Sequence, residues 1–377
     1  MIFCKKQIHC FSLFLAVAFS LSVPSLFAQE AKGKQEHHET REKKFNAGEM
    51  IMHHIVDAHE WHIADIGDKA ITIPLPVILY NSQKGLDVFM SSEFNHGETE
   101  YNGYILDHGH IKSADGTEFW DFSITKHAAA LIIGSFLVCF IFISVANNYK
   151  RNPNRAPKGM QSLIEPLILF VRDEIAKPSI GPKYQKFVPY LLTIFFFIWI
   201  NNILGLLPIF PGGANVTGSI AVTMILAIFT FIITSVNATK GYWIHIVNTP
   251  GVPWWLKFPV PLMPFVEIIG VLSKPFVLMV RLFANITAGH IIVLGFFSLI
   301  FIFAEMNEWL GLGVSAFSVL FTIFMYVLEL LVAFLQAYVF TLLSAIYFGM
   351  AVEEHHHEHD EHHEPVPVEV KEKPAVI

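Results

Sequence analysis

Long apolar segments separated by short polar stretches make up most of the chain after residue 127. Residues 128–146, 187–207 and 219–236 carry no charged side chain. Each is long enough to cross a hydrocarbon layer of about 30 Å as a helix. The pattern therefore predicts three membrane-spanning helices in these ranges.

Two further apolar segments, residues 262–304 and 312–350, are about twice as long as one span requires. Each could break into two spans or form one long helix. Two spans would need a polar turn in the middle, and neither segment has one. We therefore expect two long, tilted helices, with a kink permitted at Pro275, which makes about five transmembrane helices in all.

The two ends of the chain are polar. Residues 1–28 resemble a secretory signal peptide cut after Ala28, although Leu26 fits the cleavage pattern poorly and an uncleaved anchor is the alternative. Residues 29–125 alternate in polarity and predict an exported extension with short strands. Residues 353–377 are acidic and rich in histidine and predict a disordered tail.

Basic residues set the expected orientation. The stretch after the first span, NNYKRNPNRAPKG, is basic and contains no acid, so this side should be cytoplasmic. The mixed segment 160–180 then predicts an amphipathic helix on the cytoplasmic surface. The fold class expected is an all-α integral membrane protein, with its membrane domain at residues 126–352, its N-terminus in the periplasm and its C-terminus in the cytoplasm.

Composition supports this class and excludes others. The chain is 53% hydrophobic and contains 35 Phe, well above the usual content of a soluble domain. The net charge of −7 comes largely from the ends, and no basic stripe indicates nucleic-acid binding. Three cysteines cannot form a disulfide framework. Nucleotide-binding motifs are absent, so no cofactor is expected.

Polar residues inside the two long segments are the candidates for function. A charge at the centre of a membrane helix costs roughly 2.5–3.5 kcal/mol, so such residues usually mark an ion pathway. The candidates in these two segments are Glu267, Lys274, Arg281, Asn285, His290, Glu329 and Gln336.

Helical spacing groups these candidates. Glu267 and Arg281 fall on one stripe, because they are separated by two intervals of seven residues. His290 faces a different neighbour, and it could meet Glu329 between two helices, either as a proton relay or as a structural pair. Arg281 stays protonated and needs an anionic partner. Neither glutamate is well placed for it, so the partner is expected on another chain.

Two motifs connect the sequence with a known family. They are LSKPFVLMVRLFANITAGH and LELLVAFLQAYVFTLLSAIYFGMAVEEH, and NNILGLLPIF precedes them. Residues 120–355 thereby resemble subunit a of the bacterial F-type ATP synthase. The resemblance implies an outer helix, a surface helix, a hairpin and two long tilted helices against the ring of c subunits. It also implies an inner-membrane, non-enzymatic subunit that works with the c-ring, subunit b of the peripheral stalk and the other Fo and F1 subunits.

The resemblance also implies roles for the polar residues. Two half-channels would pass protons to and from carboxylates on the c-ring, and Arg281 would hold each passing carboxylate ionised and block a direct leak. The periplasmic half-channel would include Asn285, His290, Glu329 and Gln336. Acid and histidine are exchanged here relative to a familiar version of the family. Glu267 could line the cytoplasmic exit or contact headgroups, Lys274 is expected to be structural, and Gly205 stands where some relatives have an acid.

Histidine-rich segments suggest one alternative. Residues 53–63 and 353–364 could attract a divalent metal, with His59 and His62 sharing a helix face, although solvated polar sequence is the simpler interpretation. A divalent-metal transporter would need histidine or acidic ligands in several spans, and the first three spans have none in their cores. A membrane sensor would need a cytoplasmic effector domain, for which the tail is too short.

Overall fold

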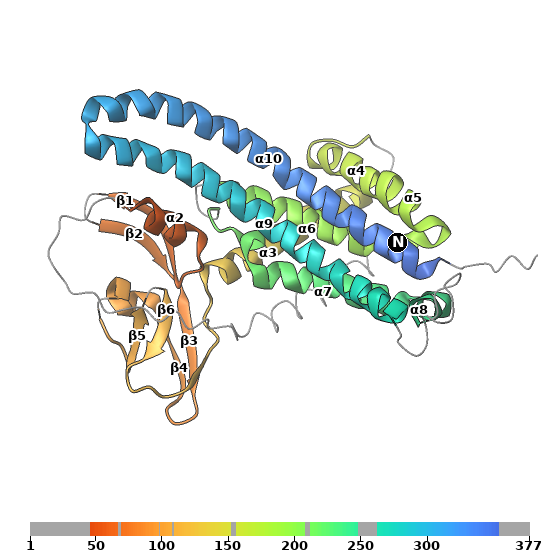
Figure 1. The fold of residues 1–377 in the computed structure, drawn as a ribbon, viewed down its shortest axis with the longest axis horizontal. Helices are drawn as coiled ribbons and strands as arrows, with labels where there is room; N and C mark the ends of the chain where they lie inside the picture. Colours follow the sequence, from red (N-terminus) through yellow and green to blue (C-terminus); the bar gives the residue numbers. More distant parts are fainter. Residues whose placement is uncertain are drawn as a thin grey trace, which may run out of the picture.

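A computed structural model describes residues 46–66, 69–97, 99–107, 109–151, 156–207, 212–247 and 262–353. It consists of a small N-terminal β-rich domain joined to a bundle of long helices (Figure 1). The predicted signal peptide and the tail after Glu353 lie outside the described residues.

Five of the described helices are long and apolar enough to cross a membrane, as predicted. They are α3 (Lys126–Arg151), α6 (Val188–Leu206), α7 (Ile220–Asn237), α9 (Leu262–Met306) and α10 (Glu308–Val352). A short helix, α8 (Lys240–Val247), precedes α9.

The last two helices form an antiparallel hairpin (Figure 1). Each has 45 residues, and Asn307 alone joins them. The side chain of Asn307 accepts a hydrogen bond from the Trp309 amide at 2.9 Å and so caps α10. The expectation of two long helices is confirmed, and α9 runs through Pro275 without a break.

The predicted surface helix at 160–180 is more complicated than expected. It is divided into α4 (Met160–Phe170), a π-helical turn (Val171–Ala176) and α5 (Lys177–Ile180), and a 3-10 turn (Gly181–Lys186) follows. Val171 and Ile175 are fully buried, because this segment packs against α6 and α10. One face of the segment is therefore part of the core and the other is exposed, as expected of an amphipathic helix.

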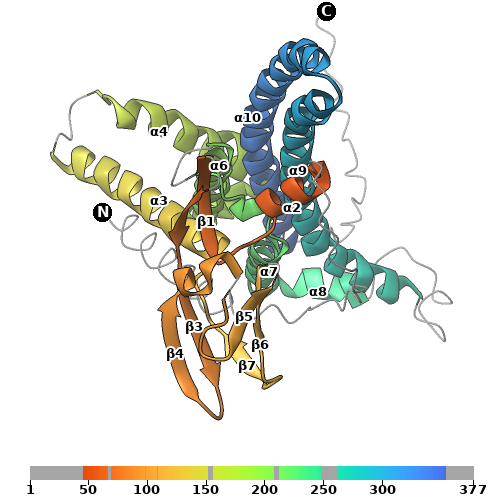
Figure 2. The same cartoon turned by 90° about the vertical axis from the view of Figure 1, so that its left-hand side faces the viewer.

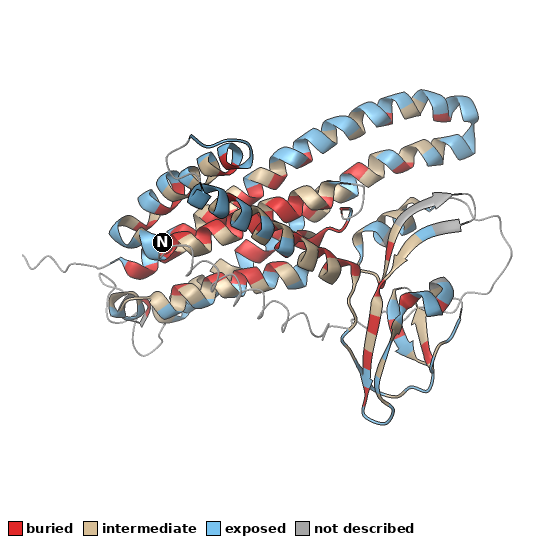
Figure 3. Cartoon of the chain, turned by 180° about the vertical axis from the view of Figure 1, so that it is seen from behind, coloured by how far each residue is buried: buried red, intermediate tan, exposed pale blue. Residues whose placement is uncertain are grey.

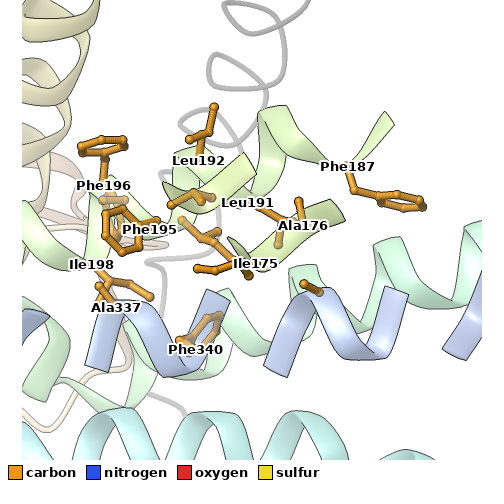
Figure 4. Packing of buried hydrophobic residues seen from close by; sticks show 14 of the residues in the cluster. Ile175, Ala176, Phe187, Leu191, Leu192, Phe195, Phe196, Ile198, Ala337 and Phe340 are labelled. Atoms are coloured by element: carbon orange, nitrogen blue, oxygen red, sulfur yellow. The ribbon is translucent and has the colours of Figure 1, made fainter. Parts of the chain in front are cut away.

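Helix α6 is the centre of the bundle. Two thirds of its span is buried, compared with little more than a quarter for α3 and α7, as the red segments of Figure 3 show. Phe195, Phe196 and Ile198 are completely enclosed, and they meet Ile175 of the π-helical turn and Phe340 of α10 (Figure 4). This packing fixes the position of α10 relative to α6.

The N-terminal domain contains the short strands that were predicted. Helix α2 (Ala47–Ile55) precedes a hairpin of β1 (Glu60–Ile66) and β2 (Lys69–Pro74). The remaining elements are β3 Pro76–Asn81, β4 Gly85–Met90, the 3-10 turn η1 Ser91–Gly97, β5 Tyr104–Asp107, β6 His110–Ser113 and β7 Phe119–Asp121. A three-stranded sheet has the order β4-β3-β7, and β5 and β6 form a second hairpin; every pair is antiparallel.

Side chains at the start of α3 join this domain firmly to the bundle. Buried Lys126 donates from Nζ to the carbonyl oxygens of His54 and Val56, both at 3.3 Å. Asp57 accepts the amide of His127 at 2.9 Å and thereby caps the first turn of α3. Trp61 of β1 packs in the same cluster as Ala130 of α3. The domain and α3 therefore meet without a free linker.

Candidate functional site

The deepest charged group in the two long helices is Glu329 of α10, which is 4% exposed. Its Oε1 atom lies 3.2 Å from Nδ1 of His290 on α9. The structure thus brings together the two residues that the sequence predicted could meet. An acid and an imidazole at this distance can exchange a proton.

Two glycines border this pair, and one of them, Gly289, makes room for it. A Cβ atom on Gly289 would lie 3.0 Å from Glu329 Oε1, and a Cβ atom on Gly205 of α6 would lie 3.9 Å from His290 Nε2. The role of Gly289 was missed from the sequence, although its place beside His290 was a signal. Gly205, the position where some relatives have an acid, borders the site next to the His290 ring.

A second polar pair lies further along the same two helices. Asn285 of α9 donates from Nδ2 to Oε1 of Gln336 on α10 at 3.0 Å. Gln336 is 1% exposed and comes seven residues after Glu329, or about 10 Å along the helix. The two pairs therefore form a polar line between α9 and α10.

Helix α6 and the turn after it add polar groups that sequence analysis overlooked. Asn202 donates to the carbonyl oxygen of Ala333, one turn after Glu329, at 3.2 Å. The hydroxyl of Thr217, in the 3-10 turn Val216–Gly218, donates to Oδ1 of Asn202. Both side chains are buried. Besides α9, three elements therefore contribute polar groups to this line: α10, α6 and the 3-10 turn Val216–Gly218.

Several polar atoms in this region are buried without a hydrogen bond inside the described part of the chain. They include Oε2 of Glu329, Nε2 of Gln336 and Oγ1 of Thr287, and Oε1 of Glu329 has only its ion-pair contact with His290. Such atoms are rare in folded proteins, because an unsatisfied buried polar group costs about 1–3 kcal/mol. Those of Glu329 and Gln336 lie on the polar line between α9 and α10, where buried groups of this kind favour a functional site.

Arg281 lies at the outside of the bundle. Its side chain is exposed, and the neighbouring Val277 and Val280 are exposed as well. Among the described residues, no carboxylate lies within ion-pairing distance of it. Arg281 is one helical turn from Asn285, so an exposed, permanent positive charge stands at one end of the polar line.

Glu267 and Lys274 lie toward the opposite end of α9 from His290. Nζ of Lys274 is 5.8 Å from the ring centre of Tyr242 and 5.5 Å from that of Tyr347, which fits the structural role expected of it. Burial and the negative charge of Glu267 raise the pKa of Tyr242 in α8. Glu267 is therefore close to α8, about 35 Å along the helix from His290.

The histidines of residues 53–63 are arranged differently from the prediction. Helix α2 ends at Ile55 and strand β1 begins at Glu60, so His59 and His62 do not share a helix face. His59 donates from Nδ1 to the carbonyl of Gly109 at 3.0 Å, and its Nε2 lies 3.4 Å from Asp121 Oδ2. The described residues contain no group of three potential metal ligands; the segment 354–364 lies outside them.

Hydrogen bonds and nearby charges shift the pKa values of both His59 and Asp121. Burial disfavours the charged form of His59, but Asp121, the Gly109 carbonyl and Asp57 together outweigh it, so the pKa of His59 is raised. Burial likewise opposes ionisation of Asp121, yet hydrogen bonds from His59 and Ser123 prevail and lower the pKa of its carboxyl. The pair is a structural tie between β1 and β7.

Comparison with known proteins tests the resemblance. A family model described as ATP synthase A chain matches residues 129–349, and a domain of unknown function matches residues 50–130. Subunit a of the ATP synthase of Chloroherpeton thalassium is 44% identical over 250 residues, 64% of this chain and 71% of that protein. Subunit a of Pelodictyon phaeoclathratiforme is 38% identical over 347 residues, 90% of this chain and 86% of that protein.

These matches extend further than predicted. A match over 90% of the chain must include most of residues 29–125, so the expectation that the resemblance stops before the N-terminal extension is wrong. The family model alone spans more than half of the chain. With these relatives and the five apolar helices, the chain belongs to the ATP synthase A chain family.

Proposed function

We propose a route by which this chain carries protons. As subunit a of ATP synthase, it is the non-catalytic, proton-translocating stator subunit of Fo. In our proposal one half-channel passes His290 and Glu329, and a second leaves past Glu267. Both reach a carboxylate of the c-ring beside Arg281.

The placing of two polar clusters on either side of Arg281 carries this proposal. His290 is nine residues from Arg281, about 13 Å along α9, and Glu267 is 14 residues away in the other direction, about 21 Å. One path straight through the protein would not need an exposed cation between its halves. Two offset paths that meet at a moving partner do need one.

The first half-channel works by proton exchange between neutral and charged groups. His290 and Glu329 can share a proton across 3.2 Å. The Asn285–Gln336 pair supplies polar atoms along the next turns toward Arg281. Asn202 and Thr217 keep this side of the path polar where α6 would otherwise present only apolar side chains.

Arg281 separates the two paths by charge. Its guanidinium does not lose its proton, so it cannot relay one. A rotor carboxylate that stops beside it is held in the ionised form, which forces the proton to leave before the carboxylate passes. The exposed position of Arg281 supports a partner on another chain, and the c-ring is the partner we propose.

The remaining assignments concern orientation and partners. Lys150 and Arg151 end α3, which supports a cytoplasmic location for that end and a periplasmic location for the N-terminal domain in the bacterial inner membrane. Residues 1–28 would then be the signal peptide and residues 353–377 a cytoplasmic tail. Subunit b and the other Fo and F1 subunits would complete the assembly.

The test is the substitution Arg281→Ala in the complete complex. Inverted membrane vesicles with the assembled variant should lose ATP-driven acidification and show a larger passive proton leak. Arg172→Ala is the matched control, because the exposed Arg172 side chain forms an ion pair with the next residue, Asp173, away from the polar line. Near-normal pumping by an assembled Arg281→Ala complex would contradict the proposal.

A further inference from the structure

The three-stranded sheet of the N-terminal domain covers the domain core with one face and exposes apolar side chains on the other. Along β3, Val77 and Leu79 point into the domain core and are completely buried. Ile78 and Tyr80 of β3 and every second residue of β4 point the other way, and Leu86 and Val88 of β4 are 64% and 61% exposed. An antiparallel sheet with one face outside its core usually carries polar residues there.

These outward residues form a continuous surface. Tyr80 of β3 pairs with Leu86 of β4 on one side and with Trp120 of β7 on the other. We define the outer sheet face as the exposed side chains of Tyr80, Leu86, Val88, Met90, Trp120 and Phe122. None of the outward positions on these three described strands carries a charge. Exposed apolar patches of this kind mark interaction sites.

Chain connectivity places this face next to the membrane. The amide of Phe122 donates to the carbonyl of Ile78 at 2.8 Å, and that of Ile124 donates to Pro76 at 3.0 Å. Helix α3, a candidate membrane span, begins at Lys126. The sheet therefore continues without a flexible linker to the point where the chain enters the bilayer.

The orientation of the sheet agrees with this position. In Figures 1 and 3, which view the molecule from opposite sides, β3 and β4 lie on the side of the domain nearer the helices. The turn η1 and strands β5 and β6 lie on the side away from them. Figure 2 shows that the β3–β4 hairpin extends beyond α3 and α7. Since both helices are candidate membrane spans, lipid would surround the bundle on that side.

We propose that the outer sheet face rests on the bilayer, with its side chains in the interfacial layer of the leaflet where α3 begins. Tyrosine and tryptophan are enriched at this level of membrane proteins, because their rings are apolar and their polar atoms can reach water. Leu86, Val88 and Met90 supply the apolar area that holds an interfacial element. Lipid, and no further subunit, is the partner.

A nitroxide spin label at position 88 tests this in the assembled complex, reconstituted into liposomes. Cys4, Cys10 and Cys139 are first replaced by serine, and the label is attached to Val88→Cys. Collisions with oxygen, which concentrates in lipid, are compared with collisions with a water-soluble nickel chelate. Lys112→Cys is the matched control, because Lys112 is exposed on β6, on the other side of the domain.

Contact with lipid predicts a several-fold higher ratio of oxygen to nickel collisions at position 88 than at position 112. Adding Leu86→Asp to the labelled chain should lower that ratio toward the control, because a charge resists transfer into the interface. Equal ratios at the two positions would overturn the proposal. Exclusion of both reagents from position 88 would also overturn it, because that result indicates a protein partner.

Discussion

Nδ1 of His290 and Oε1 of Glu329 lie 3.2 Å apart on two long helices that are joined by a one-residue turn and pack against each other. The contact depends on a close approach of α9 and α10, because Gly289 sits against the glutamate side chain. The acid and the imidazole are thus held in contact by the close packing of the two helices.

Substitution of Gly289 by alanine should disturb this contact. The new Cβ atom would lie 3.0 Å from Glu329 Oε1, so the carboxylate must move. We expect ATP-driven proton pumping in inverted vesicles to fall several-fold while the complex still assembles.

Gly295→Ala is the control on the same helix. In the described residues, nothing lies within 4 Å of a Cβ atom at Gly295. Alanine there should leave pumping intact and favour the helix by about 0.5–1 kcal/mol. Equal pumping by the two variants would show that the room beside Glu329 is unimportant.

Exchange of the acid and the histidine gives a second prediction. His290→Glu alone puts two acids together, and Glu329→His alone puts two imidazoles together, so each should lose most proton pumping. The double variant restores one acid and one imidazole in contact, and it should pump better than either single variant. Vesicle acidification at equal amounts of assembled complex measures this; a double variant as poor as the worse single would refute the relay.

The tie between His59 and Asp121 should make the N-terminal domain sensitive to pH. Since the pKa of His59 is raised from 6.5, the stabilisation from its charged form is complete below that value and is lost as the pH rises through the higher, folded pKa. Since the pKa of Asp121 is lowered from 3.8, its contribution is present above that value and is lost as the pH falls further.

Hydrogen exchange of β1 and β7 amides in the purified complex would reveal these limits. Protection should decrease as the pH rises above 6.5 and again as the pH falls below 3.8. His59→Gln should remove the loss on the alkaline side, whereas His54→Gln, on an exposed turn of α2, should keep it. A wild-type profile that stays flat above pH 6.5 would contradict the ion pair.

Lys126 should matter for docking of α2. Its ammonium group donates hydrogen bonds to two carbonyl oxygens at 3.3 Å. The substitution Lys126→Met removes this donor and should destabilise the contact between α2 and α3 by about 1–3 kcal/mol. Hydrogen exchange within Ala47–Ile55 should become faster. Lys112→Met breaks an exposed pair with Asp107 and should cost less than about 1 kcal/mol. A similar effect of both substitutions would exclude the proposed tie.

Hydropathy alone was sufficient for the bundle, because apolar length determines a membrane helix almost by itself. Helical spacing was also sufficient to bring His290 and Glu329 together. It could not find Asn202 or Thr217, because the period of one helix does not reveal which neighbour its polar side chains meet. The joint between Asp57 and His127 was equally hidden, since 70 residues separate its partners.

Two local features were not predicted from the sequence. His59 lies in the short link between α2 and β1, where the backbone changes from helix to strand, so helical spacing did not apply. The segment 160–180 contains a π-helical turn, which shifts the phase of its apolar residues and turns Val171 and Ile175 into the core. In both cases a local change in the backbone breaks the regular helical spacing on which the prediction depended.

The α9–α10 hairpin has a mechanical consequence. A sideways load on the end near Asn307 cannot be absorbed by bending one helix alone, because its partner is packed beside it along the same length. The load becomes tension in one helix and compression in the other. Both forces pass into the phenylalanine-rich core around α6, and α2 supports α9 by packing against it. The two helices thus behave as one stiff unit that is held at the end where it packs into the bundle.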